Sequence, residues 1–296
     1  MMKRTRRQFA YAATLSLTAT AMPRMMRRAV GAPLLDLNRR LDEIERKSTG
    51  RLGVAILDIN TGHSFSHQGD DLFPMCSTFK LLACAAILNM VDRRTTSLDK
   101  RIAYTRSDLV INSPITEARL KEGALTIADL CAAAMTVSDN TAGNLLLREL
   151  GGPTAITAYA RAIGDSKTRL DRIEPDLNEA ATGDSRDTTT PNAMLGNIQQ
   201  LIFGEALSKP SRTQLQDWML ANRTSRLRAG FPNYWRVADK TGSGENGTTN
   251  DVGVFWPVGH DPFIVSVYLT GASPAAEVRS AIIAEVGRAI ASTIQM

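Results

Sequence analysis

Strand-like segments near both ends of the chain, separated by a helix-rich middle, constrain its fold more than any other feature of the sequence. Two apolar runs close to the start, joined by turn residues at 60–62, predict a hairpin at 53–58 and 63–67. Further strands are expected in the last third, at 235–240, 250–256 and 263–270. Helical spacing of apolar residues predicts helices at 34–47, 78–91, 127–135, 141–149, 211–220 and 275–293. This order indicates an α+β lobe completed by both ends of the chain and an all-α insertion.

The composition is that of a globular protein. With 43% apolar and 22% charged residues among 296, the chain is neither disordered nor fibrous and can form a sizeable core. Its apolar runs stay well short of the about 20 residues that a membrane-spanning helix needs. We expect an α/β lobe at about 33–69 and 221–296 and a helical lobe at about 70–220. The polar stretch at 165–191 is expected to be a long ordered loop, and such loops are usually functional.

The first 32 residues have the pattern of an export signal. They hold seven basic residues and no acidic ones, and Thr5-Arg6-Arg7-Gln8-Phe9 precedes a short apolar stretch at 10–22. The arginine pair resembles a twin-arginine signal, although a frayed amphipathic helix start would have a similar composition. We expect cleavage after Ala21 or Ala32 and a periplasmic or secreted protein. Loss of the leader changes the formal net charge from +5 to −2, so the high pI gives no reason to expect nucleic-acid binding.

Cysteines and histidines are few. Export would permit a disulfide, and a count of three cysteines leaves one thiol over. The three histidines lie near predicted turns, and no His, Cys or Asp cluster has the spacing of metal ligands. We therefore expect no metal, no cofactor, and a monomer that binds a small molecule.

The first chemical motif is Ser77-Thr78-Phe79-Lys80. Its i, i+3 spacing places both polar side chains on one face of a helix, and the hydroxyl lies at the positive end of the helix dipole. A desolvated lysine there can accept the serine proton. Taken alone the motif is weak, because Ser97 and Lys100 match it too and because a capping serine beside a solvated lysine is the simpler interpretation.

Two more motifs are also weak when taken singly. Ser138-Asp139-Asn140 offers a hydroxyl for proton relay and an amide for a substrate carbonyl, but it is equally typical of a helix N-cap. Lys240-Thr241-Gly242 offers a cation and a hydroxyl for a carboxylate, with a glycine that permits close approach to the backbone. A strand that runs into a glycine-rich turn would look the same.

The three motifs in this chain order resemble the signature of class A serine β-lactamases and penicillin-binding proteins. The resemblance extends from about residue 34 to the C-terminus and includes an Ω-loop-like stretch at 172–178 and further matches at 136–142, 228–230 and 240–244. It implies a five-stranded antiparallel sheet flanked by helices, an all-α lobe beside it, and an active site between them. It also implies hydrolysis of the β-lactam amide of penicillins and cephalosporins, and hence antibiotic resistance.

The resemblance assigns the catalytic roles. Ser77 would be the nucleophile, Lys80 would take or relay its proton, and Ser138 would pass a proton to the leaving nitrogen. Glu174, with Asn178, would position the water that hydrolyses the acyl-enzyme, and Glu174 would be its base. Whether Lys80 or Glu174 is the base for acylation is disputed for this class and stays open here.

The resemblance also assigns substrate-binding roles. Asn140 would hold the acylamide side chain, and Lys240 and Thr241 would bind the substrate carboxylate beside Gly242. Backbone N–H groups of the nucleophile and of Ser243 would form the oxyanion hole.

Structural roles follow in the same way. Arg172 and Asp187 would pair across the neck of the Ω-loop and hold its carboxylate in place. Cys84 and Cys131 lie where family members often carry a disulfide, so we expect them to be bonded or close enough to bond.

The sequence departs from common family patterns at several positions. Thr249 stands where an arginine often binds the substrate carboxylate, and Arg226 lies where some members place a substitute, so we expect its guanidinium near Lys240. Gly244 stands where carbapenem-hydrolysing members carry a cysteine bonded to the position of Cys76. We therefore expect a free, buried thiol and no carbapenemase activity.

Two alternatives share these motifs. A penicillin-binding DD-peptidase forms a long-lived acyl-enzyme, and the segment from Glu174 to Asn178 argues against it because that carboxylate serves hydrolysis. A non-enzymatic β-lactam sensor domain would typically follow a membrane-spanning region, which the sequence lacks.

Overall fold

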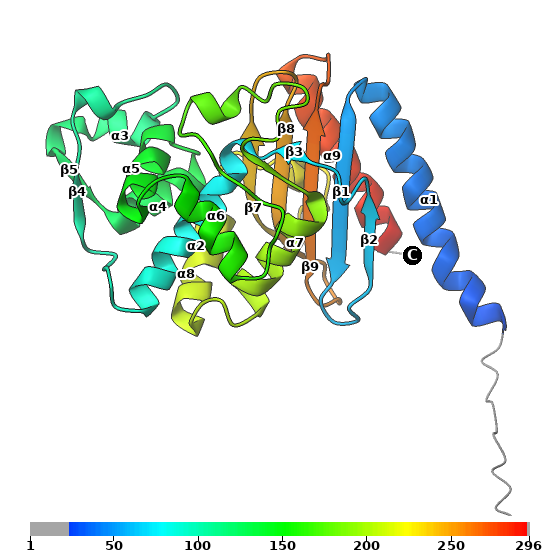
Figure 1. Ribbon diagram of the computed structural model, residues 1–296. Coiled ribbons are helices and arrows are strands. Elements are labelled where there is room, and N and C mark those ends of the chain that lie inside the picture. The colour runs from blue at the N-terminus through cyan, green and yellow to red at the C-terminus, as the bar shows by residue number, and fades with distance from the viewer. Residues whose placement is uncertain (1–23, 295–296) are drawn as a thin grey trace, which may run out of the picture.

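The computed structural model describes residues 24–294, with side chains described from residue 35 on. Its main sheet has five antiparallel strands in the order β2-β1-β9-β8-β7 (Figure 1). The strands are β1 (Arg51–Asp58), β2 (Ser64–His67), β7 (Arg236–Ser243), β8 (Thr249–Trp256) and β9 (Phe263–Thr270). Two come from the start of the described chain and three from its end, which confirms the predicted fold class.

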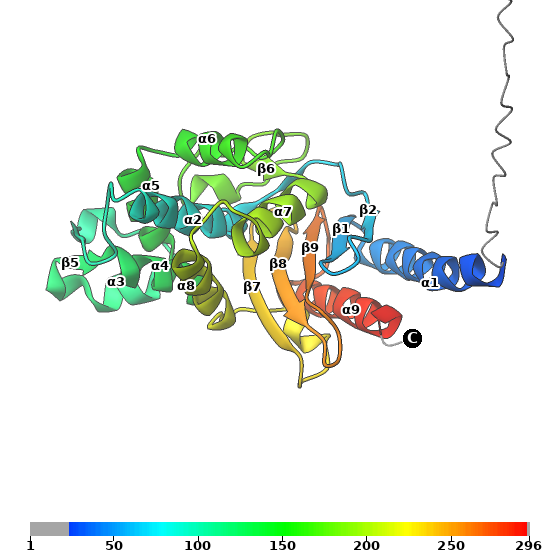
Figure 2. The same cartoon turned by 90° about the horizontal axis from the view of Figure 1, so that it is seen from below.

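Helices cover both faces of this sheet (Figure 2). α1 (Arg24–Ser48) and α9 (Ala276–Ile294) pack on one face, in an apolar core that includes Leu41 and Phe255. The other face packs against α7 (Pro191–Ile198) and the helical lobe in a second core. Because β9 is covered on both sides, six of its eight residues are buried, which explains its nearly continuous apolar sequence.

The helical lobe lies beside β7 (Figure 1). Its helices are α2 (Phe79–Asp92), α3 (Pro114–Ala118), α4 (Ile127–Thr136), α5 (Asn140–Leu150), α6 (Thr154–Ala162) and α8 (Lys209–Leu220). Two short strand pairs join its loops: β3 (Phe73–Pro74) with β6 (Thr188–Thr189), and β4 (Arg101–Ala103) with β5 (Ala124–Thr126). α2 packs against α4, α5, α6 and α8, and a helix surrounded in this way is apolar on all sides.

The structure differs from the sequence-based expectations in detail. The first helix begins at Arg24 rather than at residue 34, and α3, α6 and α7 were not predicted. These three helices have nine residues or fewer, so each offers few apolar positions from which a helical period can be identified. The expected loop at 165–191 is present and contains only the 3-10 turn Asp176–Asn178 and β6 before α7 begins. Most of the expected export signal, residues 1–23, lies outside the described residues. Across residues 24–294, no helix combines the length and apolarity needed to cross a membrane.

Candidate active site

The side chains of Ser77 and Lys80 lie together at the start of α2. Ser77 occupies the 3-10 turn Cys76–Thr78 that leads into the helix, and the lysine follows on the same face. Lys80 Nζ is 2.9 Å from Ser77 Oγ. Both residues are buried, and the N-cap residue of α2 is Thr78. A capping serine beside a solvated lysine is therefore the wrong interpretation of this motif.

The second Ser-x-x-Lys sequence has a different geometry. Ser97 lies in the loop after α2, where its hydroxyl accepts the backbone N–H of Asp99 at 3.2 Å. Lys100 pairs with Glu149 at 2.7 Å on the surface of the helical lobe. Its ammonium is engaged by a carboxylate instead of facing the serine.

The Lys80 ammonium is the centre of the site. Besides the hydroxyl of Ser77, its Nζ lies 2.9 Å from the Ser138 carbonyl oxygen, 2.7 Å from Asn140 Oδ1 and 2.8 Å from Glu174 Oε1. Two sequence motifs and the loop carboxylate thus converge on one nitrogen. The side chains of Lys80 and Glu174 are both fully buried. Removal of either partner would leave an uncompensated charge in the interior.

Glu174 is held by both its side chain and its backbone. Oε1 accepts the Ser77 hydroxyl at 3.2 Å, and Oε2 accepts the amide of Asn178. Asn144 on α5 accepts the Glu174 backbone N–H at 2.9 Å and donates to its carbonyl oxygen at 2.8 Å. Sequence reasoning missed Asn144. The available signal was its position one helical turn after Asn140, which places both amides on one face of α5.

Ser138 lies between α4 and α5 with a positive φ of 60°. Its hydroxyl oxygen is 3.0 Å from Lys240 Nζ and 3.5 Å from Lys80 Nζ. Asp139 caps α5 by accepting the backbone N–H of Ala142 at 2.8 Å. The capping role is therefore carried by the middle residue of the motif, and the serine hydroxyl is left between two lysines.

On the edge strand β7, Lys240 contacts Ser138 of the helical lobe, and the hydroxyl of Thr241 contacts that of Thr224. A Cβ added to Gly242 would lie 2.7 Å from the Met75 carbonyl oxygen, so glycine is needed for β7 to pack against the turn before α2. Lys240 is fully buried. Burial lowers the pKa of Lys240 to about 7, and the charges of neighbouring cations act in the same direction.

Arg226 lies against β7 and β8, with its guanidinium directed at the strand ends. Nη2 donates to Ser243 Oγ at 2.7 Å, and Nη1 donates to the Asn250 carbonyl oxygen at 3.1 Å. Burial lowers the pKa of Arg226 from its ordinary value, but an arginine stays charged at neutral pH. Thr249 accepts a hydrogen bond from Arg279 Nε at 3.1 Å, which places a second arginine nearby that sequence reasoning missed.

The neck of the loop that carries Glu174 is closed by Arg172 and Asp187. Arg172 Nε donates to Asp187 Oδ2 at 2.6 Å. The other carboxylate oxygen accepts the backbone N–H groups of Asp171 and Arg172 at 2.7 and 2.9 Å. The aspartate is buried, so this contact is a structural pair and not a surface one.

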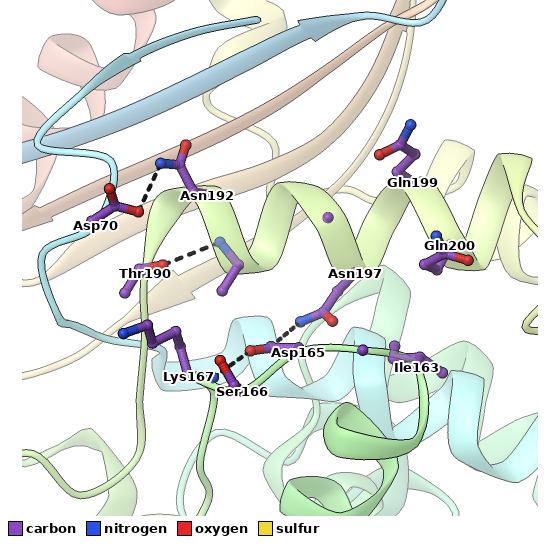
Figure 3. A pocket seen from close by; sticks show the side chains of 13 residues that line it. Asp70, Ile163, Asp165, Ser166, Lys167, Thr190, Asn192, Asn197, Gln199 and Gln200 are labelled. Atoms are coloured by element: carbon purple, nitrogen blue, oxygen red, sulfur yellow. Dashed lines mark hydrogen bonds between the residues drawn. The ribbon is translucent and has the colours of Figure 1, made fainter. Parts of the chain in front are cut away.

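A cavity of about 400 Å³ lies where this loop begins and ends, between residues 163–167 and α7 (Figure 3). Asp165 accepts the Lys167 backbone N–H at 2.7 Å and the Asn197 amide at 2.6 Å. Burial would raise the pKa of Asp165, but its hydrogen bonds outweigh burial and lower it. The contact with Asn197 ties the start of the loop to α7.

All three cysteines are free and buried in the structure. The expected disulfide between Cys84 and Cys131 is not formed, although Cys84 Sγ lies 3.9 Å from the Cys131 carbonyl oxygen. The bond itself stays a prediction. A Cβ added to Gly244 would lie 2.6 Å from Cys76 Sγ, so glycine also leaves room for this thiol.

Within the part of the chain that the structure describes, no group of His, Cys, Asp or Glu residues is arranged to hold a metal ion. The groups in contact with the Ser77 side chain are an ammonium and a carboxylate. A hydroxyl held by such groups is typical of nucleophilic catalysis with general acid–base assistance.

Known proteins are similar to this chain over most of their length. The family model of the beta-lactamase enzyme family matches residues 36–294. One similar solved structure is that of a class A β-lactamase described as the last common ancestor of Gram-negative bacteria (GNCA4). Its sequence is 55% identical to this chain, and the two structures match with a TM-score of 0.86 over 87% of this chain and 99% of that chain. The chain belongs to the class A β-lactamases. Beta-lactamase AST-1 of Nocardia asteroides is 46% identical over 86% of this chain and 83% of its own length. Beta-lactamase OXY-2 of Klebsiella oxytoca is 41% identical over 93% and 96%.

Proposed function

We propose that this class A β-lactamase hydrolyses penicillins and cephalosporins through an acyl-enzyme on Ser77 and thereby confers antibiotic resistance. The observation that carries the proposal is the contact of one hydroxyl with two groups of opposite charge. Ser77 Oγ is 2.9 Å from Lys80 Nζ and 3.2 Å from Glu174 Oε1. A buried serine in this position can lose its proton as it attacks a carbonyl carbon.

Acylation uses the groups around α2 and β7. Ser77 Oγ attacks the β-lactam carbonyl, and its proton passes to Glu174, or to Lys80 after the ammonium has given a proton to Glu174. The oxyanion accepts hydrogen bonds from the backbone N–H groups of Ser77 and Ser243. The C–N bond then breaks, and the leaving nitrogen takes a proton from the Ser138 hydroxyl. That hydroxyl is replenished through either adjacent lysine, since it lies within 3.5 Å of both.

Deacylation depends on Glu174 and Asn178. The carboxylate accepts a proton from a water molecule as it attacks the ester carbonyl. The C–O bond to Ser77 then breaks, and the proton returns from Glu174 to Ser77 Oγ. Because Glu174 is pinned at its side chain and backbone, its position is set before substrate arrives. A DD-peptidase with a long-lived acyl-enzyme would have no use for a carboxylate held in this way.

Substrate binding combines an amide with a pair of cations. Asn140 holds the acylamide side chain, while Lys240, Thr241 and Arg226 bind the carboxylate next to Gly242. An arginine adds a planar, bidentate contact to the point charge of a lysine.

Location and assembly are part of the proposal. The basic leader and its pair Arg6-Arg7 support export to the periplasm or medium by the twin-arginine route. We also propose that the protein is a monomer. Replacement of both arginines by lysine should then retain precursor in the cytoplasm. Unchanged periplasmic activity would indicate the general secretory route.

A turnover panel tests the function. The purified mature protein is assayed with a penicillin, two cephalosporins and a carbapenem, beside the Ser77→Ala variant. We expect rapid turnover of the first three substrates by the wild type only. Absence of turnover with a persistent covalent adduct on the wild type would favour a penicillin-binding protein.

A further inference from the structure

Residues 222–227 form an irregular segment that carries one side of the carboxylate end of the site. Only its last residue belongs to a short helix, the 3-10 turn Leu227–Ala229. The segment places the Arg226 guanidinium on Ser243 and the Thr224 hydroxyl on the hydroxyl of Thr241. Regular backbone hydrogen bonding does not fix this segment, so other groups must.

Two buried acids supply those contacts. Asp251 Oδ2 accepts the backbone N–H groups of Arg226 at 2.8 Å and of Leu227 at 2.9 Å. Asp239 accepts the Asn222 amide at 2.5 Å through Oδ1 and the Ser225 hydroxyl through Oδ2. Four hydrogen bonds from two side chains thus hold one short segment.

The sheet brings the two acids together. Asp239 lies on β7 opposite Gly253, and Asp251 lies on β8 opposite Thr241, so the acids are diagonal neighbours on one face. Neither has exposed surface. Three cations lie near the acids: Arg226 on the irregular segment, Arg228 on the 3-10 turn Leu227–Ala229, and Lys240 on β7. Arg279 on α9 lies near Arg226.

Burial raises the pKa of both carboxyl groups in this setting. Burial raises the pKa of Asp251 to about 8, and the nearby Asp239 carboxylate adds to the rise. Asp251 Oδ1 has no hydrogen-bond partner among the described residues, so it is the oxygen free to carry a proton. A neutral Asp251 still accepts both N–H groups through Oδ2, and the pair avoids the repulsion of two buried charges.

We propose that Asp239 and Asp251 are positioning residues for binding of the substrate carboxylate: they hold residues 222–227 so that Arg226 faces the carboxylate site. The inference rests on the proposed function. It assigns a role in substrate binding to two acids that touch neither the substrate nor Ser77.

The test separates KM from kcat. Asp251→Ala should raise KM for benzylpenicillin by up to about tenfold with little change in kcat, because loss of uniform binding acts on KM. Asp251→Asn should stay near wild type, since an amide oxygen accepts the same two N–H groups. Asp261→Asn, an exposed acid in the β8–β9 turn, is the matched control and should match the wild type.

Asp251→Ala leaves two N–H groups unpaired and can destabilise the fold, so a second, milder variant is needed. Ser225→Ala removes only the hydroxyl bonded to Asp239 and should raise KM by about two- to threefold, a smaller loss of the same kind. In an Arg226→Ala background, Asp251→Ala should have no further effect on KM. The inference fails if Asp251→Ala and Ser225→Ala both leave KM unchanged, or if Asp251→Asn does not keep KM near the wild-type value. It also fails if the effects of Asp251→Ala and Arg226→Ala on KM add in the double variant. Wild-type protein without turnover would instead refute the proposed function.

Discussion

Replacement of Asp187 by alanine tests whether the neck of the Ω-loop holds Glu174 in place. The Asp187 carboxylate accepts three hydrogen bonds, two from backbone N–H groups and one from Arg172 Nε at 2.6 Å. Its side chain is 1% exposed, whereas that of Arg172 is 16% exposed. The substitution removes one acceptor of the Arg172 guanidinium and the acceptor of both N–H groups.

The structure sets the size of the effect. Loss of one partner of a buried pair costs about 3–5 kcal/mol. Arg172 keeps a contact with Glu179, at 2.5 Å, so the lower end applies. For a domain of this size a loss of about 3 kcal/mol lowers Tm by about 6–12 °C.

The assay combines thermal unfolding, followed by circular dichroism, with mass spectrometry after brief exposure to penicillin. We expect the lowered Tm together with a persistent acyl-enzyme, because the misplaced Glu174 no longer activates water. Asp71→Ala is the control, since both Asp71 and its partner Arg51 are exposed and the pair lies at the surface. A Tm within about 2 °C of wild type, with no acyl-enzyme, would refute the reasoning.

Three further predictions concern single residues. Arg226→Ala should lower kcat/KM for penicillins by roughly ten- to a hundredfold, as expected for loss of a charge-assisted contact, and full kcat/KM in steady-state assays would contradict this. The pKa of Lys240 is lowered to about 7, so its side chain is charged below that pH and neutral above it. KM measured in a pH series should therefore rise as the pH increases through about 7. A KM that does not change with pH would show that the lysine stays charged. Ser97→Ala should retain wild-type turnover. Loss of turnover in this variant would indicate that Ser97, and not Ser77, is the nucleophile.

Local patterns predicted much of the fold and the site. The strands at both ends have apolar runs long enough to identify, and β9 was placed at its observed bounds, 263–270. Ser77, Ser138 and Lys240 belong to short motifs whose spacing is itself chemical information. Their convergence around Lys80 could be expected from the family resemblance but not from any one motif.

Other residues could not be found because their partners are distant in sequence. Asn144 bonds Glu174 across 30 positions, and Asp251 bonds Arg226 across 25. An asparagine in a helix or an aspartate in a strand has no local pattern that indicates such a contact. Cys84 and Cys131 were expected to be neighbours, and they lie close together in the structure. The family resemblance alone does not determine whether they are bonded.

Intact-protein mass spectrometry of the Glu174→Ala variant tests the central claim most directly. If Ser77 is acylated and Glu174 activates the deacylating water, brief exposure to penicillin should add the mass of one penicillin to this variant, and peptide mapping should locate it on Ser77. The wild type should show little adduct under the same conditions because it turns over. Rapid turnover by Glu174→Ala, or an adduct on any residue other than Ser77, would contradict the mechanism.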